Sequence, residues 1–98
     1  MVTPKYNITK LEHMSDVLKA VSHPLRIAIV DLLIQAEELT VTEIHNKLNI
    51  SQPEASRQLA ILKNANLIEC RKEANTRFYS LVDKSISKLL HCVENCTV

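Results

Sequence analysis

The sequence contains no glycine among its 98 residues. Glycine allows the close backbone approach on which phosphate-binding loops depend, so its absence argues against nucleotide-hydrolysing enzymes. The sequence also offers no serine, histidine and aspartate set around a glycine elbow, no evident pair of catalytic carboxylates and no cofactor fingerprint. We therefore expect that the protein is not an enzyme and binds no cofactor.

Cysteine and long apolar runs are also scarce. The three cysteines, Cys70, Cys92 and Cys96, are too few for a secreted disulfide framework and favour free thiols in a reducing compartment. No apolar run approaches the roughly 20 residues that a transmembrane helix needs. Residues 1–10 are polar and contain Pro4, unlike a signal peptide. We expect a cytoplasmic protein outside the membrane.

The formal net charge is only +1, so the chain as a whole is not the basic molecule that nonspecific nucleic-acid binding would suggest. The distribution of charge says more. Residues 1–50 hold five Lys and Arg against six Asp and Glu, whereas residues 51–80 hold five against three. The small basic excess therefore falls on one segment.

Hydrophobic periodicity predicts five helices and one hairpin in a single domain, residues 1–98. A chain of this length buries a modest core, which a partner chain would enlarge. The second helix is apolar nearly all round and is expected at the centre. The expected elements are helices at 7–21, 24–36, 40–48, 51–66 and 84–95 and a hairpin at 67–82.

Local signals specify where these elements begin and turn. Thr40 with Glu43, and Ser51 with Glu54, have the spacing of capping boxes, and Pro24 and Pro53 suit first helical turns. Asn49 suits a left-handed helix end, and Ile50 can fill the angle between two helices. Asn75 is expected to take the positive backbone angle in the hairpin turn, and Asp83 to cap the last helix.

The segment 51–66 has two distinct faces at 100° per residue. Ala55, Gln58, Leu59 and Leu62 cluster on one side. The opposite side carries Pro53, Arg57, Ala60 and Asn64, flanked by Ser56 and Lys63, with no bulky aliphatic residue at its centre. This slim polar face indicates a helix that can enter a DNA groove.

Residues 40–66 thus indicate a helix-turn-helix, and the charged hairpin 67–82 follows it directly, which is the winged-helix arrangement. From about Val17 to Asp83 the sequence resembles the ArsR family of bacterial transcriptional repressors. The resemblance rests on Leu18-Lys-Ala-Val-Ser-His-Pro-Leu-Arg26, on Leu48-Asn-Ile-Ser-Gln-Pro-Glu-Ala-Ser-Arg-Gln-Leu-Ala-Ile-Leu-Lys63 and on Arg77-Phe-Tyr-Ser-Leu81. It implies a homodimer held by helices 7–21 and 84–95, bound to a pseudo-palindromic operator until an unknown signal releases it. Solvent-facing stripes on these helices are the alternative.

Candidate DNA contacts follow from side-chain chemistry. Arg57 can donate a bidentate pair to guanine or clamp a phosphate, and Gln52 has the amide geometry for adenine. Ser56 is short enough to reach a base edge or a phosphate, and Pro53 permits close approach. Gln58 and Lys63 complete the set on the helix, and Arg71, Lys72 and Arg77 are expected to meet phosphates from the hairpin.

Each of these assignments has a structural alternative. Arg57 can pair with Glu54 on a solvated surface, Gln58 can be a half-buried structural amide, and the hairpin cations can be merely solvated. As a whole, the domain can also serve as a protein- or RNA-interaction module that binds no operator.

Metal-sensing motifs of the resembled family are missing. Thr40, Thr42 and His45 stand where its cysteine cluster would fall, and Ser85 stands where a histidine ligand would follow Asp83. We therefore expect no such metal site. His91, Cys92 and Cys96 remain as candidates for soft-metal or thiol chemistry, the alternative being small residues that extend an apolar stripe.

Overall fold

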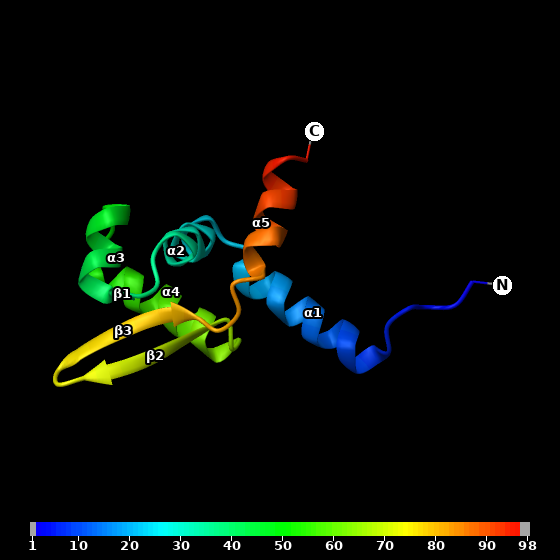
Figure 1. Ribbon diagram of the computed structural model, residues 1–98, viewed down its shortest axis with the longest axis horizontal. Coiled ribbons are helices and arrows are strands. Elements are labelled where there is room, and N and C mark those ends of the chain that lie inside the picture. The colour runs from blue at the N-terminus through cyan, green and yellow to red at the C-terminus, as the bar shows by residue number, and fades with distance from the viewer. Residues whose placement is uncertain (1, 97–98) are drawn as a thin grey trace.

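The computed structural model describes residues 2–96 and has the expected mainly helical fold with a small antiparallel sheet (Figure 1). None of the helices within these residues is long and apolar enough to cross a membrane. The elements, in chain order, are α1 (Ile8–Val21), α2 (Pro24–Gln35), β1 (Leu39–Thr40), α3 (Val41–Leu48), α4 (Gln52–Asn64), β2 (Ile68–Glu73), β3 (Thr76–Leu81) and α5 (Ile86–Glu94).

Helix α2 lies at the centre of the core, as its apolar sequence predicts. Ile29, Val30 and Leu33 are fully buried, and α2 contacts α1, α3, α4 and β3. Pro24 occupies the first turn, and the His23 ring caps it by accepting the Leu25 N–H at 3.1 Å. The buried core is Val21, Ile29, Val30, Leu33, Leu39, Ile44, Ala55, Leu59, Leu62, Ile68 and Leu81.

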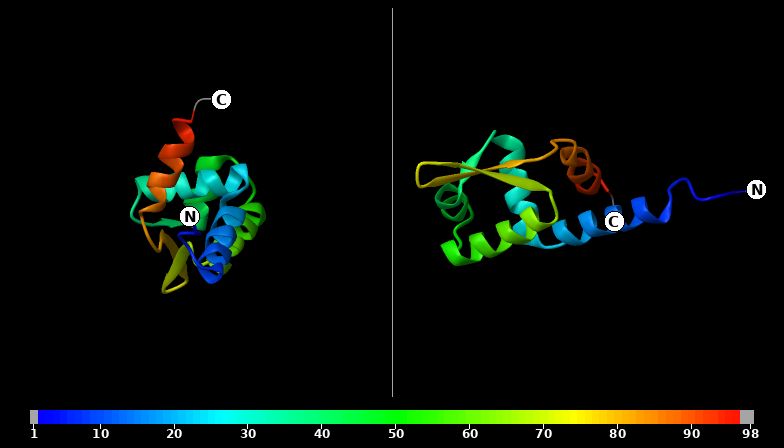
Figure 2. Two further views of the ribbon diagram at one scale, coloured as in Figure 1. Left: turned by 90° about the vertical axis from the view of Figure 1, so that its right-hand side faces the viewer. Right: turned by 90° about the horizontal axis from the view of Figure 1, so that it is seen from below.

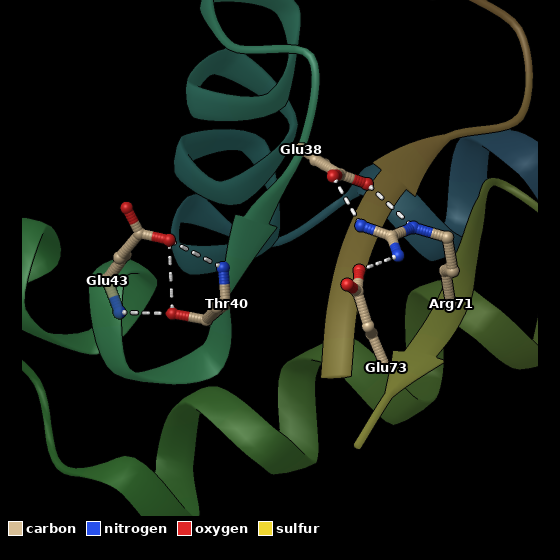
Figure 3. Close-up of polar contacts among 5 residues, drawn as sticks. All are labelled: Glu38, Thr40, Glu43, Arg71 and Glu73. Atoms are coloured by element: carbon tan, nitrogen blue, oxygen red, sulfur yellow. Dashed lines mark hydrogen bonds and ion pairs between the residues drawn. The ribbon is translucent and has the colours of Figure 1, made fainter. Parts of the chain in front are cut away.

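The connection from α3 to α4 follows its predicted signals. Thr40 and Glu43 form a reciprocal capping box, in which the Thr40 hydroxyl accepts the Glu43 N–H at 3.2 Å and the Glu43 carboxylate accepts the Thr40 N–H at 3.0 Å (Figure 3). Asn49 is left-handed at φ 55°, and Ile50 packs against the core. The turn therefore fixes the angle between the two helices.

At the start of α4 only half of the expected capping box forms. The Ser51 hydroxyl accepts the Glu54 N–H at 3.2 Å. The Glu54 carboxylate does not return to the Ser51 N–H but accepts from the side chains of Arg57 and Gln58. The Glu54 carboxylate therefore bonds to side chains one turn further along the helix and not to the N-cap residue.

The sheet has the strand order β1-β3-β2, and all neighbours are antiparallel. The two-residue strand β1 was not predicted, because its pairing of Leu39 with Tyr79 depends on a distant strand. The prediction for Asn75 was wrong, since the positive backbone angle belongs to Ala74, at φ 54°. Pairing of Glu73 with Thr76 leaves a two-residue loop, in which the first residue takes the positive angle that matches the strand twist.

The expected cap on the last helix was also wrong. Asp83 accepts the Ser85 N–H at 2.9 Å, which closes a tight turn before the helix. Helix α5 then begins at Ile86, and Ser85 occupies its N-cap position without a side-chain bond. Asp83 therefore shapes the loop that leads into α5.

Helices α1 and α5 lie at the end of the molecule away from the hairpin tip, as both Figure 1 and the right panel of Figure 2 show. Helix α1 buries only Ala20 and Val21, and α5 buries none of its residues. Ile8 on α1 is 69% exposed and Leu18 is 52% exposed. We call α1 and α5 the arms.

Candidate DNA-binding surface

Helix α4 presents its two faces as the sequence predicts. Its buried residues are Ala55, Gln58, Leu59 and Leu62. Ile61 is a partly exposed aliphatic residue on the flank of the outer face. The exposed residues that could meet a ligand are Gln52, Pro53, Ser56, Arg57, Ala60 and Lys63.

A groove of about 430 Å³ separates α4 from the hairpin. Ser56, Ala60 and Lys63 line it from α4, while Asn75, Arg77 and Tyr79 line it from the hairpin turn and β3. The fold thus joins the outer face of the helix and the hairpin in one surface. Lys63 and Arg77 supply positive charge from both walls.

Lys72 and Arg77 are direct partners across the antiparallel pair of β2 and β3, and both are exposed. Directly opposed residues share one face of a sheet, and like charges in such a pair destabilise it. An anion bound between them would offset that repulsion. The pair is therefore suited to a phosphate.

Arg71 differs from its neighbour Lys72. Its guanidinium contacts Glu38 at 2.7 Å and Glu73 at 2.5 Å, as Figure 3 shows, and lies 4.6 Å from the centre of the Phe78 ring. The hydrogen bonds to the two carboxylates raise the pKa of Arg71. Since Arg71 opposes Phe78, it lies on the other face from Lys72. Its charge is compensated, and we exclude it from the candidate surface.

Gln58 is also excluded, because it is only 4% exposed. Its carbonyl accepts from Nη1 of Arg26 at 2.9 Å, and its NH₂ donates to Glu54 at 3.0 Å. Of the two roles that the sequence left open, this geometry favours the structural amide. Arg57 does form the ion pair with Glu54, through Nη1, yet its side chain stays 66% exposed.

Two groove residues, Asn75 and Tyr79, were not among the predicted contacts. Burial, followed by the influence of Cys70, raises the pKa of Tyr79, so its hydroxyl stays protonated and can donate to a phosphate oxygen. The period of two along β3 was the available signal, because it places Tyr79 on the same face as Arg77.

The thiol candidates lie far from this surface, on α5 and just after it. Cys92 and Cys96 are exposed, and Nε2 of His91 lies 3.1 Å from the side-chain nitrogen of Asn95. Within residues 2–96, no group of three or more His, Cys, Asp or Glu residues is arranged to hold a metal ion. A single chain therefore does not assemble these residues into a metal site.

Comparisons with known proteins match the same part of the chain. The sequence profile of a family described as a helix-turn-helix domain matches residues 21–71, which contain α3 and α4. A biofilm growth-associated repressor of Agrobacterium fabrum is 36% identical over 76 residues, which cover 78% of this chain and 64% of that repressor.

Solved structures give the same assignment over the whole fold. HlyU from Vibrio cholerae is similar with a TM-score of 0.81 and 33% identity, covering 89% of this chain and 97% of that one. A homodimeric winged helix-turn-helix DNA-binding domain from Mycobacterium bovis, described as a possible ArsR-family transcriptional regulator, gives 0.78 and 27%, covering 94% and 87%. The Agrobacterium protein is named as a repressor and the Mycobacterium bovis domain as a possible transcriptional regulator, in agreement with the sequence prediction of a regulator. The chain belongs to the ArsR family of winged helix-turn-helix DNA-binding transcriptional regulators.

Proposed function

We propose that the protein is a cytoplasmic, homodimeric repressor that places helix α4 of each protomer in the major groove of a pseudo-palindromic operator. The hairpin of β2 and β3 then reaches the flanking phosphates. The proposed contacts are Gln52, Pro53, Ser56, Arg57, Ala60, Lys63, Lys72 and Arg77.

The shared groove between α4 and the hairpin carries this proposal. A major groove about 12 Å wide admits a helix whose outer side chains are short, and Ser56 and Ala60 meet that requirement along the groove. Arg57 then projects from the same helix with most of its side chain accessible, as guanine recognition needs. The hairpin cations Lys72 and Arg77 would then contact phosphates of the duplex.

The exposed apolar residues of the arms are an argument for a dimer. Their apolar residues are exposed in the single chain, whereas a two-fold contact would bury the same stripes on both copies. The Mycobacterium bovis relative is homodimeric. Such a dimer would present its two α4 helices about 34 Å apart, one turn of DNA, and so read two half-sites. The Agrobacterium relative is named as a repressor and HlyU of Vibrio cholerae as a transcriptional activator, and the proposal of repression follows the former.

Arg57→Ala tests the proposal directly. The wild-type protein first selects a duplex from a random-sequence library, and fluorescence anisotropy then compares variants on that duplex. Each lost guanine contact is worth about 1–3 kcal/mol, so two half-sites predict a loss of at least about thirtyfold. Arg71→Ala is the matched control, since that arginine pairs with Glu38 and Glu73 and is expected to change affinity little.

Unchanged affinity of Arg57→Ala on the selected duplex would refute the assignment of α4 as the reading helix. If the wild-type protein enriches no duplex at all, the interaction-module alternative is favoured instead.

A further inference from the structure

A continuous chain of polar contacts runs from the end of α1 to the proposed reading arginine. Arg26 on α2 donates from Nε to the carbonyl of Ala20 at 2.5 Å and from Nη1 to the Gln58 carbonyl at 2.9 Å. Gln58 donates to Oε1 of Glu54 at 3.0 Å, and the second oxygen of Glu54 contacts Arg57. Three helices therefore contribute to one connected set.

The donor and acceptor groups fix the direction of each hydrogen bond in this series. Arginine has only donors and an ionised glutamate has only acceptors, so the amide of Gln58 must turn its oxygen to Arg26 and its nitrogen to Glu54. Both ends of this buried amide are thereby satisfied. Gln58 has one orientation, which holds the Glu54 carboxylate in one place.

Arg57 gains a fixed starting geometry from that carboxylate. A long, exposed arginine loses rotamer freedom when it binds a base, and a side chain already held in place loses less. The Glu54 contact uses Nη1, so the guanidinium keeps further N–H donors for a base. The end of α1 is thus linked by hydrogen bonds, through Arg26 on α2, to the position of Arg57.

We propose that Arg26 and Gln58 are positioning residues that set operator specificity by fixing Glu54 and, through it, Arg57. This inference rests on the proposed function. It gives a role to Arg26 at the end of the segment Leu18–Arg26 and to a glutamine that does not itself touch DNA. Sequence-specific binding should depend on this series of polar contacts. Binding of Lys72 and Arg77 to DNA phosphates should not.

An exchange of two side chains tests the proposal. Gln58→Glu turns two carboxylates toward each other and breaks the contact with Glu54. In the double variant Glu54→Gln with Gln58→Glu, the carboxylate at position 58 accepts from Arg26 and from the new amide, whose oxygen accepts from Arg57. Every contact of the chain is restored in a new order of groups.

The selected duplex and a scrambled duplex of the same composition are the two probes, with thermal unfolding recorded for each variant. Gln58→Glu is expected to lower affinity for the selected duplex about tenfold, the size of one modest base contact, while affinity for the scrambled duplex at low salt is unchanged. The double variant is expected to recover most of the loss. Ile44→Val is a core change in α3 that touches none of these polar contacts. It controls for reduced stability and should leave the ratio of the two affinities unaltered.

Equal losses on both duplexes, or no recovery in the double variant, would overturn the proposal. If Gln58→Glu does not fold, Arg26→Met removes the same link while retaining the aliphatic stem, and the same loss of discrimination is expected. A wild-type protein that does not discriminate the duplexes refutes the proposed function itself, and that result is distinct from discrimination that these variants leave intact.

Discussion

The two arms differ from the helix-turn-helix and its sheet in how far their apolar side chains are buried. We call the region from α2 to β3 the reading head: its helices seal a core in which Ile29, Ile44 and Leu62 have no exposed surface. The arms carry apolar residues of similar size, yet α5 buries none of them. The head therefore has a buried core within one chain, whereas the apolar stripes of the arms form the surface that we propose a second copy covers.

Polar groups differ between the two regions in the same way. In the head, Arg26 and Gln58 find partners on three helices. On α5, the side chain of Asn95 reaches only to His91, one turn back on the same helix. Long-range polar contacts hold the shape of the head, and one of them reaches the end of α1 at the Ala20 carbonyl.

Ile44→Ala should produce the largest effect, on the head. The substitution leaves a cavity under α3, and such losses cost about 2–5 kcal/mol of unfolding free energy. Urea denaturation at fixed protomer concentration measures it. Leu18→Ala on the exposed arm is the contrast, with a much smaller expected change, and equal losses would break the comparison.

Leu18→Asp should separate the copies without unfolding the head. A charge on the apolar stripe of α1 disfavours the dimer, and loss of the second binding site lowers apparent operator affinity by about a hundredfold or more. Light scattering gives the mass, and anisotropy gives the affinity. Lys19→Asp, the adjacent exposed change, is the control; a variant that remains dimeric would place the interface elsewhere.

Lys72→Ala should weaken binding to every duplex alike, by a smaller factor. Each lost phosphate contact flattens the slope of log affinity against log salt by about 0.9. Titrations at several salt concentrations measure that slope. Arg71→Ala, which removes a cation already paired with two carboxylates, should leave it nearly unchanged; equal slopes for the two variants would argue against the assignment of Lys72 to a phosphate.

The smallest effect concerns the capping box at α3. Thr40→Ala should cost about 1 kcal/mol. The Thr40 backbone N–H, followed by its hydroxyl, lowers the pKa of Glu43 in the folded state, so the unfolded chain binds the extra proton first as the solution is acidified. This contribution is therefore present above the unfolded-state pKa and is lost as pH falls through the folded-state value. Glu43→Ala should make acid unfolding less steep, as circular dichroism can test.

Much of the candidate surface could be predicted because helix periodicity is local. The burial of Ala55, Leu59 and Leu62 follows from their spacing alone. Gln58 shares that spacing, yet its role depended on Arg26, 32 positions earlier, which no local pattern contains. The ion pair of Arg71 with Glu38, 33 positions earlier, likewise lies outside any local pattern.

By itself, the sequence determined the order of the five helices and the hairpin, the centre of the core, the capping box at Thr40 and the left-handed turn at Asn49, since each depends on residues within one or two helical turns. Only the tertiary structure decided which cations have a carboxylate partner within the chain. Strand pairing in the sheet brings Arg71 to Glu38, and the packing of α2 against α4 brings Arg26 to the Gln58 amide. A charged side chain binds whichever partner the fold places beside it, and that partner is not a neighbour in the sequence.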